Sequence, residues 1–173
     1  MAPSYPAMAL DAEQQQRFAE LIDQHRGIVF KVAGTYARGP DDRDDLAQEI
    51  AAQLWYGFPR YDGSRRFSTW MYRIALNVAI SHLRSATQRQ RHWLALDLSL
   101  HDVPDDHDAD HEHNQQVRAL HRFIQAQEPL NRALLLLYLE DRSTREMADI
   151  LGITETNVAT KISRLKQRIR DEI

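Results

Sequence analysis

The chain of 173 residues contains no cysteine. Disulfides and thiolate metal sites are therefore excluded, which fits a reducing compartment. Glycine and proline number six each, and no stretch shows the sustained alternation of apolar and polar residues that predicts strands. Residues 1–11 carry neither a basic cluster nor a long apolar run, so we expect no signal peptide, no membrane span and a cytoplasmic protein.

Lysine and arginine are missing from Leu94 to Asn114, where seven acidic residues fall. The formal net charge is -3, so without these seven acids the chain would carry +4. Such dense like charge with few apolar side chains predicts a solvated linker. The same segment holds four histidines, for which metal binding or pH sensing is an alternative role: His101, His107, His111 and His113. We nevertheless expect no bound metal and no cofactor.

Apolar residues elsewhere recur at spacings of three and four, which is typical of amphipathic helices. The sequence therefore predicts an all-α protein. Two small helical domains, residues 13–87 and 115–173, are expected to be joined by a flexible acidic linker at residues 88–114.

The most specific pattern is a helix-turn-helix near the C-terminus. Ser143 and Glu146 form a capping box that predicts a helix starting at Thr144, and Gly152 is suited to a left-handed helix end. Thr154 can cap a second, basic helix, which in this geometry enters the DNA major groove. The base-reading candidates are Thr156, Asn157, Thr160 and Lys161, and the phosphate-contacting candidates further along are Arg164, Lys166 and Arg168. A helical hairpin that only packs is the alternative.

An acidic helix is predicted in the N-terminal block. Its inward stripe comprises Leu46, Ile50 and Leu54, extended by Trp55 and Phe58, with Asp45, Gln48 and Glu49 on the opposite side. Taken alone, this pattern is most simply a solvated helix face whose acids suit the helix dipole.

A basic, aromatic segment follows, with seven arginines and one acid between Arg60 and Arg91. Ser68 can cap a helix that starts near Thr69. Arginines interleaved with aromatic rings suit unstacked single-stranded bases, although such rings are more often part of a core.

Together, and in this order, these segments resemble the extracytoplasmic-function group of the sigma-70 family. The family's acidic motif is matched by Asp42, Asp45, Leu46, Gln48, Glu49 and Trp55. Its next motif is matched by Phe67, Trp70, Met71, Tyr72, Ile74, Ala75 and Asn77. The helix-turn-helix motif is matched by Ser143, Glu146, Met147, Ala148, Leu151, Gly152, Ile153, Val158, Arg164, Leu165 and Lys166.

The resemblance implies a non-enzymatic subunit that binds core RNA polymerase and directs it to promoters. The acidic set, Asp42, Asp45, Leu46, Gln48, Glu49 and Trp55, would dock on the clamp helices of the largest subunit. The -10 promoter element would be bound by Arg65, Arg66, Trp70, Arg73, Asn77 and Arg84. The -35 element would be bound by Arg145, Thr156, Asn157, Thr160, Lys161, Arg164 and Arg168. The flap of the second-largest polymerase subunit and an anti-sigma protein are further partners that the resemblance suggests.

Two positions depart from the family pattern. Ser81 stands where members often carry Asp, and Arg142 stands where they often carry Gly before the helix-turn-helix. The main competing interpretation is a helix-turn-helix regulator that binds promoter DNA without polymerase. A metal-dependent hydrolase using the linker histidines is a more distant one, because ligands on a spacer lack a rigid support.

Overall fold

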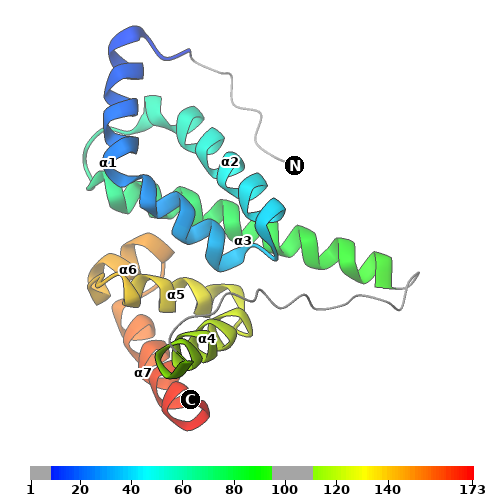
Figure 1. The fold of residues 1–173 in the computed structure, drawn as a ribbon. Helices are drawn as coiled ribbons and strands as arrows, with labels where there is room; N and C mark the ends of the chain where they lie inside the picture. Colours follow the sequence, from blue (N-terminus) through cyan, green and yellow to red (C-terminus); the bar gives the residue numbers. More distant parts are fainter. Residues whose placement is uncertain (1–8, 95–110) are drawn as a thin grey trace.

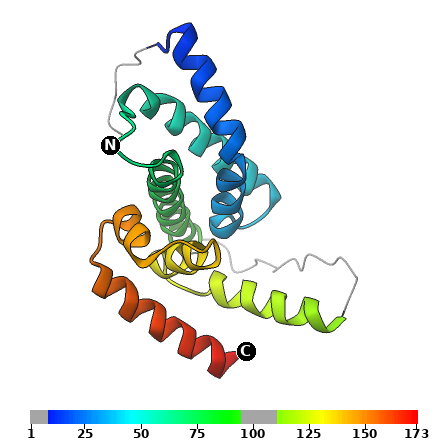
Figure 2. The ribbon, with the colours of Figure 1, turned by 90° about the vertical axis from the view of Figure 1, so that its left-hand side faces the viewer.

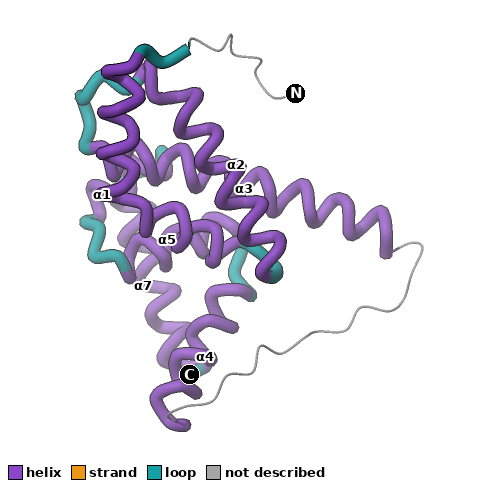
Figure 3. Tube along the Cα trace, turned by 45° about the horizontal axis from the view of Figure 1, so that its top comes forward, coloured by secondary structure: helices purple, strands orange, loops and turns teal. Residues whose placement is uncertain are grey.

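The computed structural model describes residues 9–94 and 111–173, and within these ranges all regular structure is helical (Figures 1 and 3). The N-terminal block contains α1 (Ala12–Tyr36), α2 (Pro40–Gly57), a short 3-10 turn (Phe58–Arg60) and α3 (Phe67–Leu94). The C-terminal block contains α4 (His111–Gln125), α5 (Pro129–Leu139), α6 (Thr144–Leu151) and α7 (Glu155–Glu172). The expected all-α class with two helical blocks is confirmed.

Helices α1, α2 and α3 pack against one another to form the core of the N-terminal block. The predicted inward stripe of α2 is correct, since Leu46, Ile50 and Leu54 are all fully buried. Val32 from α1 and Met71 from α3 are also fully buried and belong to the same apolar cluster. This core fixes which side of α2 and which side of α3 remain in solvent.

Local capping explains where several helices start. Asp11 forms a capping box with Gln14 at the start of α1, and Pro40 occupies the first turn of α2, where its missing N–H costs nothing. The expected start of α3 near Thr69 was two residues late, because the helix begins at Phe67. Ser68 consequently lies inside the first turn and is buried rather than capping the helix.

The C-terminal block is built around α5, in which Leu134 and Leu137 are fully buried. Helix α7 packs on both α5 and α6 through an apolar stripe that includes Val158 and Leu165. The leucine-rich helix α5 therefore supports the second helix of the helix-turn-helix.

The two blocks lie against each other through α6 on α3 and through α4 and α5 on α1. Figure 2 shows α7 on the side of the C-terminal block that faces away from α1, α2 and α3. The segment between the blocks was expected to be a linker from residue 88 to residue 114. Within that range, α3 extends to Leu94 and α4 begins at His111.

His101 and His107 lie outside the described residues, as do the side chains of His111 and His113. The metal and pH hypotheses for this cluster therefore stay predictions. Among the described residues, no group of three or more acidic or histidine side chains is arranged to hold a metal ion. None of the helices in these ranges combines the length and the apolar character needed to cross a bilayer.

Candidate polymerase and promoter interfaces

The solvent side of α2 carries an acidic surface formed by Asp45, Gln48 and Glu49, which are all exposed. Trp55 lies further along the helix with 38% of its surface exposed, and its ring packs edge-on against Phe18 at 5.2 Å. We call these four residues, Asp45, Gln48, Glu49 and Trp55, the α2 acidic face. They combine negative charge with one anchored aromatic ring, as a contact surface for a basic partner requires.

Two residues of the expected polymerase-binding set, Leu46 and Asp42, do not belong to this exposed surface. Leu46 is fully buried in the core, so it supports α2 and has no surface to offer a partner. Oδ2 of Asp42 accepts a hydrogen bond from the Arg38 backbone N–H at 2.9 Å, and its Oδ1 lies 2.7 Å from Nε2 of His82. Burial acts to raise the pKa of Asp42, but the Arg38 hydrogen bond and the His82 contact outweigh it and lower that pKa. Asp42 thus links the start of α2 to α3.

The loop before α3 has a defined shape that presents two arginines. Gly63 adopts a left-handed φ of 76°, and Oδ1 of Asp62 accepts a hydrogen bond from the Ser64 N–H at 2.9 Å. The Tyr61 hydroxyl donates to the Arg65 carbonyl at 2.9 Å, which holds the last part of the loop. Arg65 and Arg66 are exposed as a result.

A cluster of aromatic rings packs against this loop and stabilises it. Phe67 is buried, and its ring lies 5.4 Å from Tyr61 and 5.2 Å from Trp70. Phe58 joins the cluster from the 3-10 turn, at 6.1 Å from Tyr61. The core interpretation of these rings is therefore correct for Phe67, whereas Trp70 remains half-buried and reaches the surface.

A cavity of about 480 Å³ lies beside Trp70, between α2 and α3. Its walls include the rings of Trp70 and Tyr56 and the side chain of Ile74, and the amides of Gln53 and Asn77 also line it. A flat apolar wall with nearby amides can stack and hydrogen-bond a single unstacked base. Tyr56 and Gln53 were absent from the expected site. Their positions in the sequence of α2 do not distinguish them from ordinary surface residues of a helix.

The helix-turn-helix has the local geometry that its sequence predicts. Oγ of Ser143 accepts from the Glu146 N–H at 3.1 Å, and Glu146 accepts in return from the Ser143 N–H at 2.9 Å. The Ser143 backbone hydrogen bond is the main cause that lowers the pKa of Glu146. Gly152 ends α6 with a left-handed φ of 67°, and Oγ1 of Thr154 caps α7 by accepting from the Asn157 N–H at 3.1 Å.

The basic face of α7 points away from its apolar stripe. Val158 is fully buried, whereas the residues expected to read DNA are exposed or, for Lys161, half-buried: Thr156, Asn157, Thr160, Lys161 and Arg164. Arg145 is exposed on the neighbouring helix α6. The five α7 side chains therefore share one accessible surface, which we call the α7 face. Arg145 lies apart from them, in a pocket that is also lined by Arg65 and Arg66.

Arg168 differs from the other expected -35 residues because its guanidinium is held within the domain. It lies 5.4 Å above the Phe123 ring and donates to Oε1 of Gln127 at 3.0 Å. Glu172 pairs with it at 3.4 Å, and about half of the side chain remains exposed, 51%. Arg168 therefore anchors α7 to the α4–α5 corner, and any DNA contact would compete with these partners.

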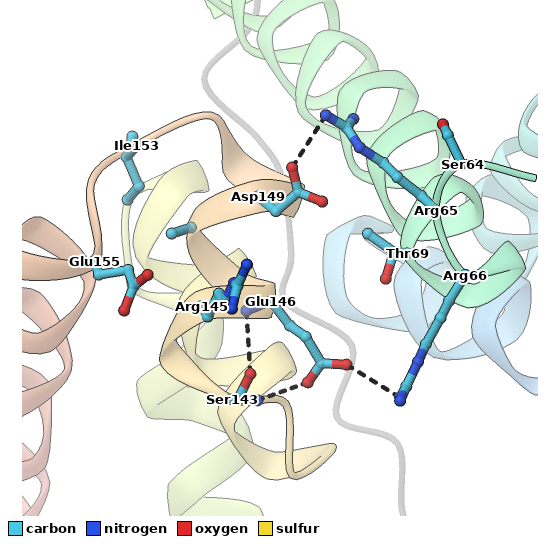
Figure 4. Close-up of a pocket in the computed structure, with 11 residues that line it drawn as sticks. Ser64, Arg65, Arg66, Thr69, Ser143, Arg145, Glu146, Asp149, Ile153 and Glu155 are labelled. Atoms are coloured by element: carbon cyan, nitrogen blue, oxygen red, sulfur yellow. Dashed lines mark hydrogen bonds and ion pairs between the residues drawn. The ribbon is translucent and has the colours of Figure 1, made fainter.

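Three of the -10 candidates, two in the loop before α3 and one on α3, meet α6 of the other block; Figure 4 shows the two loop residues. Arg65 pairs with Asp149 at 3.2 Å, Arg73 pairs with the same carboxylate at 3.9 Å, and Arg66 pairs with Glu146 at 3.7 Å. These partners were not expected from the sequence, where no local pattern relates α3 to α6. Asn77 and Arg84 lie further along α3 and are exposed.

Comparison with known families identifies both blocks. Residues 21–89 match sigma-70 region 2, and residues 118–169 match sigma-70 region 4. Together the two matches span most of the chain. The chain belongs to the extracytoplasmic-function (ECF) group of sigma-70 sigma factors.

Two curated relatives agree with this assignment along most of the chain. One is the ECF RNA polymerase sigma factor SigW of Bacillus subtilis, which is 22% identical and pairs 92% of this chain with 90% of its own. Another is the ECF RNA polymerase sigma-E factor of Haemophilus influenzae, which is 29% identical over 83% of this chain and 82% of its own.

A solved structure with a similar fold is the sigma factor RpoE in complex with the anti-sigma factor NepR from Bartonella quintana. It has a TM-score of 0.65 at 14% identity and covers 92% of this chain and 95% of its own.

As an ECF sigma factor, this protein binds core RNA polymerase and DNA and directs promoter-specific transcription initiation. It is not an enzyme, because the polymerase carries out the chemistry. The match of the N-terminal block to region 2 replaces the alternative of a regulator that acts without polymerase.

Proposed function

We propose that the α2 acidic face docks on the clamp helices of the largest polymerase subunit. The observation that supports this assignment is the outward direction of Asp45, Gln48 and Glu49 on a helix whose other side is locked in the core. Trp55, edge-packed on Phe18, would add apolar contact area with little loss of side-chain freedom. Leu46 and Asp42 then contribute indirectly, by holding α2 in place.

The -10 element would be held along α3 and the loop before it. Arg65, Arg66 and Arg73 supply cations for the backbone of an unstacked strand, and Arg84 would extend that track. The cavity beside Trp70 and Asn77 would receive one base, with stacking on the ring and hydrogen bonds to the amide. Its volume, about 480 Å³, is ample for a single nucleobase.

The -35 element would be read as duplex by the α7 face. Thr156, Asn157 and Thr160 lie in the first half of α7, the part of a recognition helix that meets base edges. Lys161, Arg164 and Arg145 would mainly contact phosphates and so set register and affinity. Region 4 would also meet the flap of the second-largest polymerase subunit, using surface away from the α7 face.

An anti-sigma protein is a further candidate partner, because the similar RpoE structure was solved with the anti-sigma factor NepR. Such a partner would bind at a cavity of about 490 Å³ between α1 and the α4–α5 pair. Phe30, Val117 and Leu139 line it, and each is about half exposed, at 61%, 46% and 51%. Apolar side chains clustered at a block boundary are typical of a protein-binding surface.

Run-off transcription tests the proposal as a whole. Purified core polymerase would be incubated with fragmented genomic DNA of the source organism, with and without this protein. We expect discrete transcripts that depend on the protein and share paired -35 and -10 elements upstream of their start sites. The absence of protein-dependent start sites, with intact folding shown by circular dichroism, would reject the assignment of these surfaces.

A further inference from the structure

Besides apolar packing, polar contacts join the two blocks at three places. At the first, α1 meets the α4–α5 corner: the Tyr36 hydroxyl donates to the Pro129 carbonyl at 2.7 Å, and Arg132 donates to the Thr35 carbonyl at 3.5 Å. At the second, Nζ of Lys31 lies 2.6 Å from Oε2 of Glu140. The third is the meeting of α3 with α6, where charged groups of both signs are paired.

At this third place, carboxylates of α6 occupy the cations of the proposed -10 surface. Asp149 pairs with both Arg65 and Arg73. Figure 4 shows its pair with Arg65 and the approach of Glu146 to Arg66. A carboxylate offers arginine the same kind of oxygen acceptor as a phosphate does. While these pairs are formed, Asp149 partly neutralises the positive charge of Arg65 and Arg73. Both arginines then attract the phosphates of a DNA strand less strongly.

Arg142 connects the two sides of this contact. Its guanidinium lies 5.2 Å above the ring of Tyr72 in α3, and Nη1 reaches the Ser68 hydroxyl at 3.4 Å. Asp141, just before it in the turn between α5 and α6, has a positive φ of 54°. Arg142 stands at the position where the family often has Gly, which has no side chain to insert.

The contact between α3 and α6 is weak enough to open. The side chains of the Arg65–Asp149 pair are 45% and 39% exposed, and exposed ion pairs hold weakly and are screened by salt. The boundary also leaves two buried polar atoms without a hydrogen-bond partner, Nε of Arg142 and the Tyr72 hydroxyl. Such atoms disfavour the closed arrangement, because both regain water when the blocks separate.

We infer that the free chain closes on itself so that α6 covers the -10 surface of α3 while the α7 face stays accessible. This inference rests on the proposed function of both surfaces. The closed chain would bind -35 duplex normally but single-stranded -10 DNA weakly, since only the open fraction can bind it. Partners that hold the blocks apart would thereby switch on -10 binding.

The Lys31–Glu140 pair allows a test that leaves both DNA surfaces unaltered. Lys31→Glu removes the attraction and adds repulsion at the boundary, and it also makes the chain two charges more negative. Negative charge alone would weaken binding to DNA, so any gain in -10 affinity reports opening. Lys31→Glu combined with Glu140→Lys restores the pair and the wild-type net charge. Arg26→Glu is the matched control, because Arg26 pairs with Asp23 of its own helix.

Two measurements are made on the full-length protein. Because the chain has no cysteine, Gln24→Cys in α1 and Gln116→Cys in α4 can carry a dye pair that reports the distance between the blocks. A fluorescent single-stranded oligonucleotide with the non-template -10 sequence, taken from the run-off promoters, reports affinity. We expect Lys31→Glu to lower energy transfer and tighten oligonucleotide binding about threefold to tenfold. The double variant should restore both values, and Arg26→Glu should show neither change.

Either of two results would overturn the inference. One is unchanged energy transfer in Lys31→Glu, which would show that the free chain is not closed through this pair. The other is lower energy transfer without tighter binding, which would show that closure does not cover the -10 surface. Failure of the proposed function is separately visible, as loss of run-off transcription with a normal dye distance in the wild-type chain.

Discussion

Nε2 of His82 lies 2.7 Å from Oδ1 of Asp42, which joins the middle of α3 to the first turn of α2. The α2 acidic face follows directly after this turn, so the pair helps to set the direction in which the acids of the proposed polymerase contact point. Asp42 therefore carries a structural role within a motif whose other acids face solvent.

We expect Asp42→Asn to lower the free energy of unfolding at neutral pH by about 0.5–1 kcal/mol, a value reduced because the pair is partly solvated. The folded-state pKa of Asp42 lies below its ordinary value of 3.8, so its contribution is present above that value and is lost as the pH falls through the lower, folded-state pKa. Urea denaturation at a series of pH values checks this. The wild type should lose more stability than the variant as the pH is lowered through this acid range. Parallel curves for the two proteins would show that the pair contributes nothing.

Reversal of the acidic face should uncouple the protein from polymerase. Asp45→Lys with Glu49→Lys should reduce core polymerase binding at least about tenfold, because two exposed charges of the proposed contact are inverted. Fluorescence anisotropy with purified core polymerase measures the affinity. The matched control is Glu20→Lys with Asp23→Lys, which makes the same charge change on the exposed side of α1. Equal losses in both double variants would mean that net charge, and not this face, determines binding.

Substitutions on the α7 face should distinguish residues that read bases from residues that attract phosphates. Asn157→Ala should cost about 1–3 kcal/mol on the correct -35 duplex and little on unrelated DNA, as expected for a base contact. Arg164→Gln should weaken both duplexes alike and reduce the slope of log affinity against log salt by about 0.9. Titrations at several salt concentrations distinguish the two outcomes. Identical behaviour of the two variants would contradict the division of the face.

Gly152 should be required for the turn between α6 and α7. Its φ of 67° disfavours any residue with a Cβ, yet a Cβ built there meets nothing within 4 Å. Gly152→Ala should therefore destabilise the protein by about 1 kcal/mol through backbone strain alone. Gly27→Ala is the control: it lies inside α1 with equal space around it, and it should stabilise the protein by about 0.5–1 kcal/mol. Denaturant titration measures both changes, and a neutral Gly152→Ala would show that the turn tolerates another shape.

Much of each helix could be predicted because the controlling interactions are local. The capping box of Ser143 and Glu146 and the stop at Gly152 involve residues only a few positions apart, and the structure has them as expected. The inward stripe of α2 was likewise correct, since helical periodicity alone decides which residues share a face. The start of α3 was missed because the aromatic packing of Phe67 extends the helix past Ser68, and that packing involves other elements.

The sequence by itself determined the helical class, the helix-turn-helix and the family motifs, because these depend on neighbours within a few turns. Only the tertiary structure decided which expected site residues remain available to a partner. Leu46 is committed to the core, Asp42 to His82 and Arg168 to Gln127. The pairing of Lys31 with Glu140 joins positions 109 residues apart, and no periodic pattern encodes such a contact. It arises from the way the two helical blocks meet, and that meeting also sets α6 against Arg73 of α3 and the arginines of the loop before it.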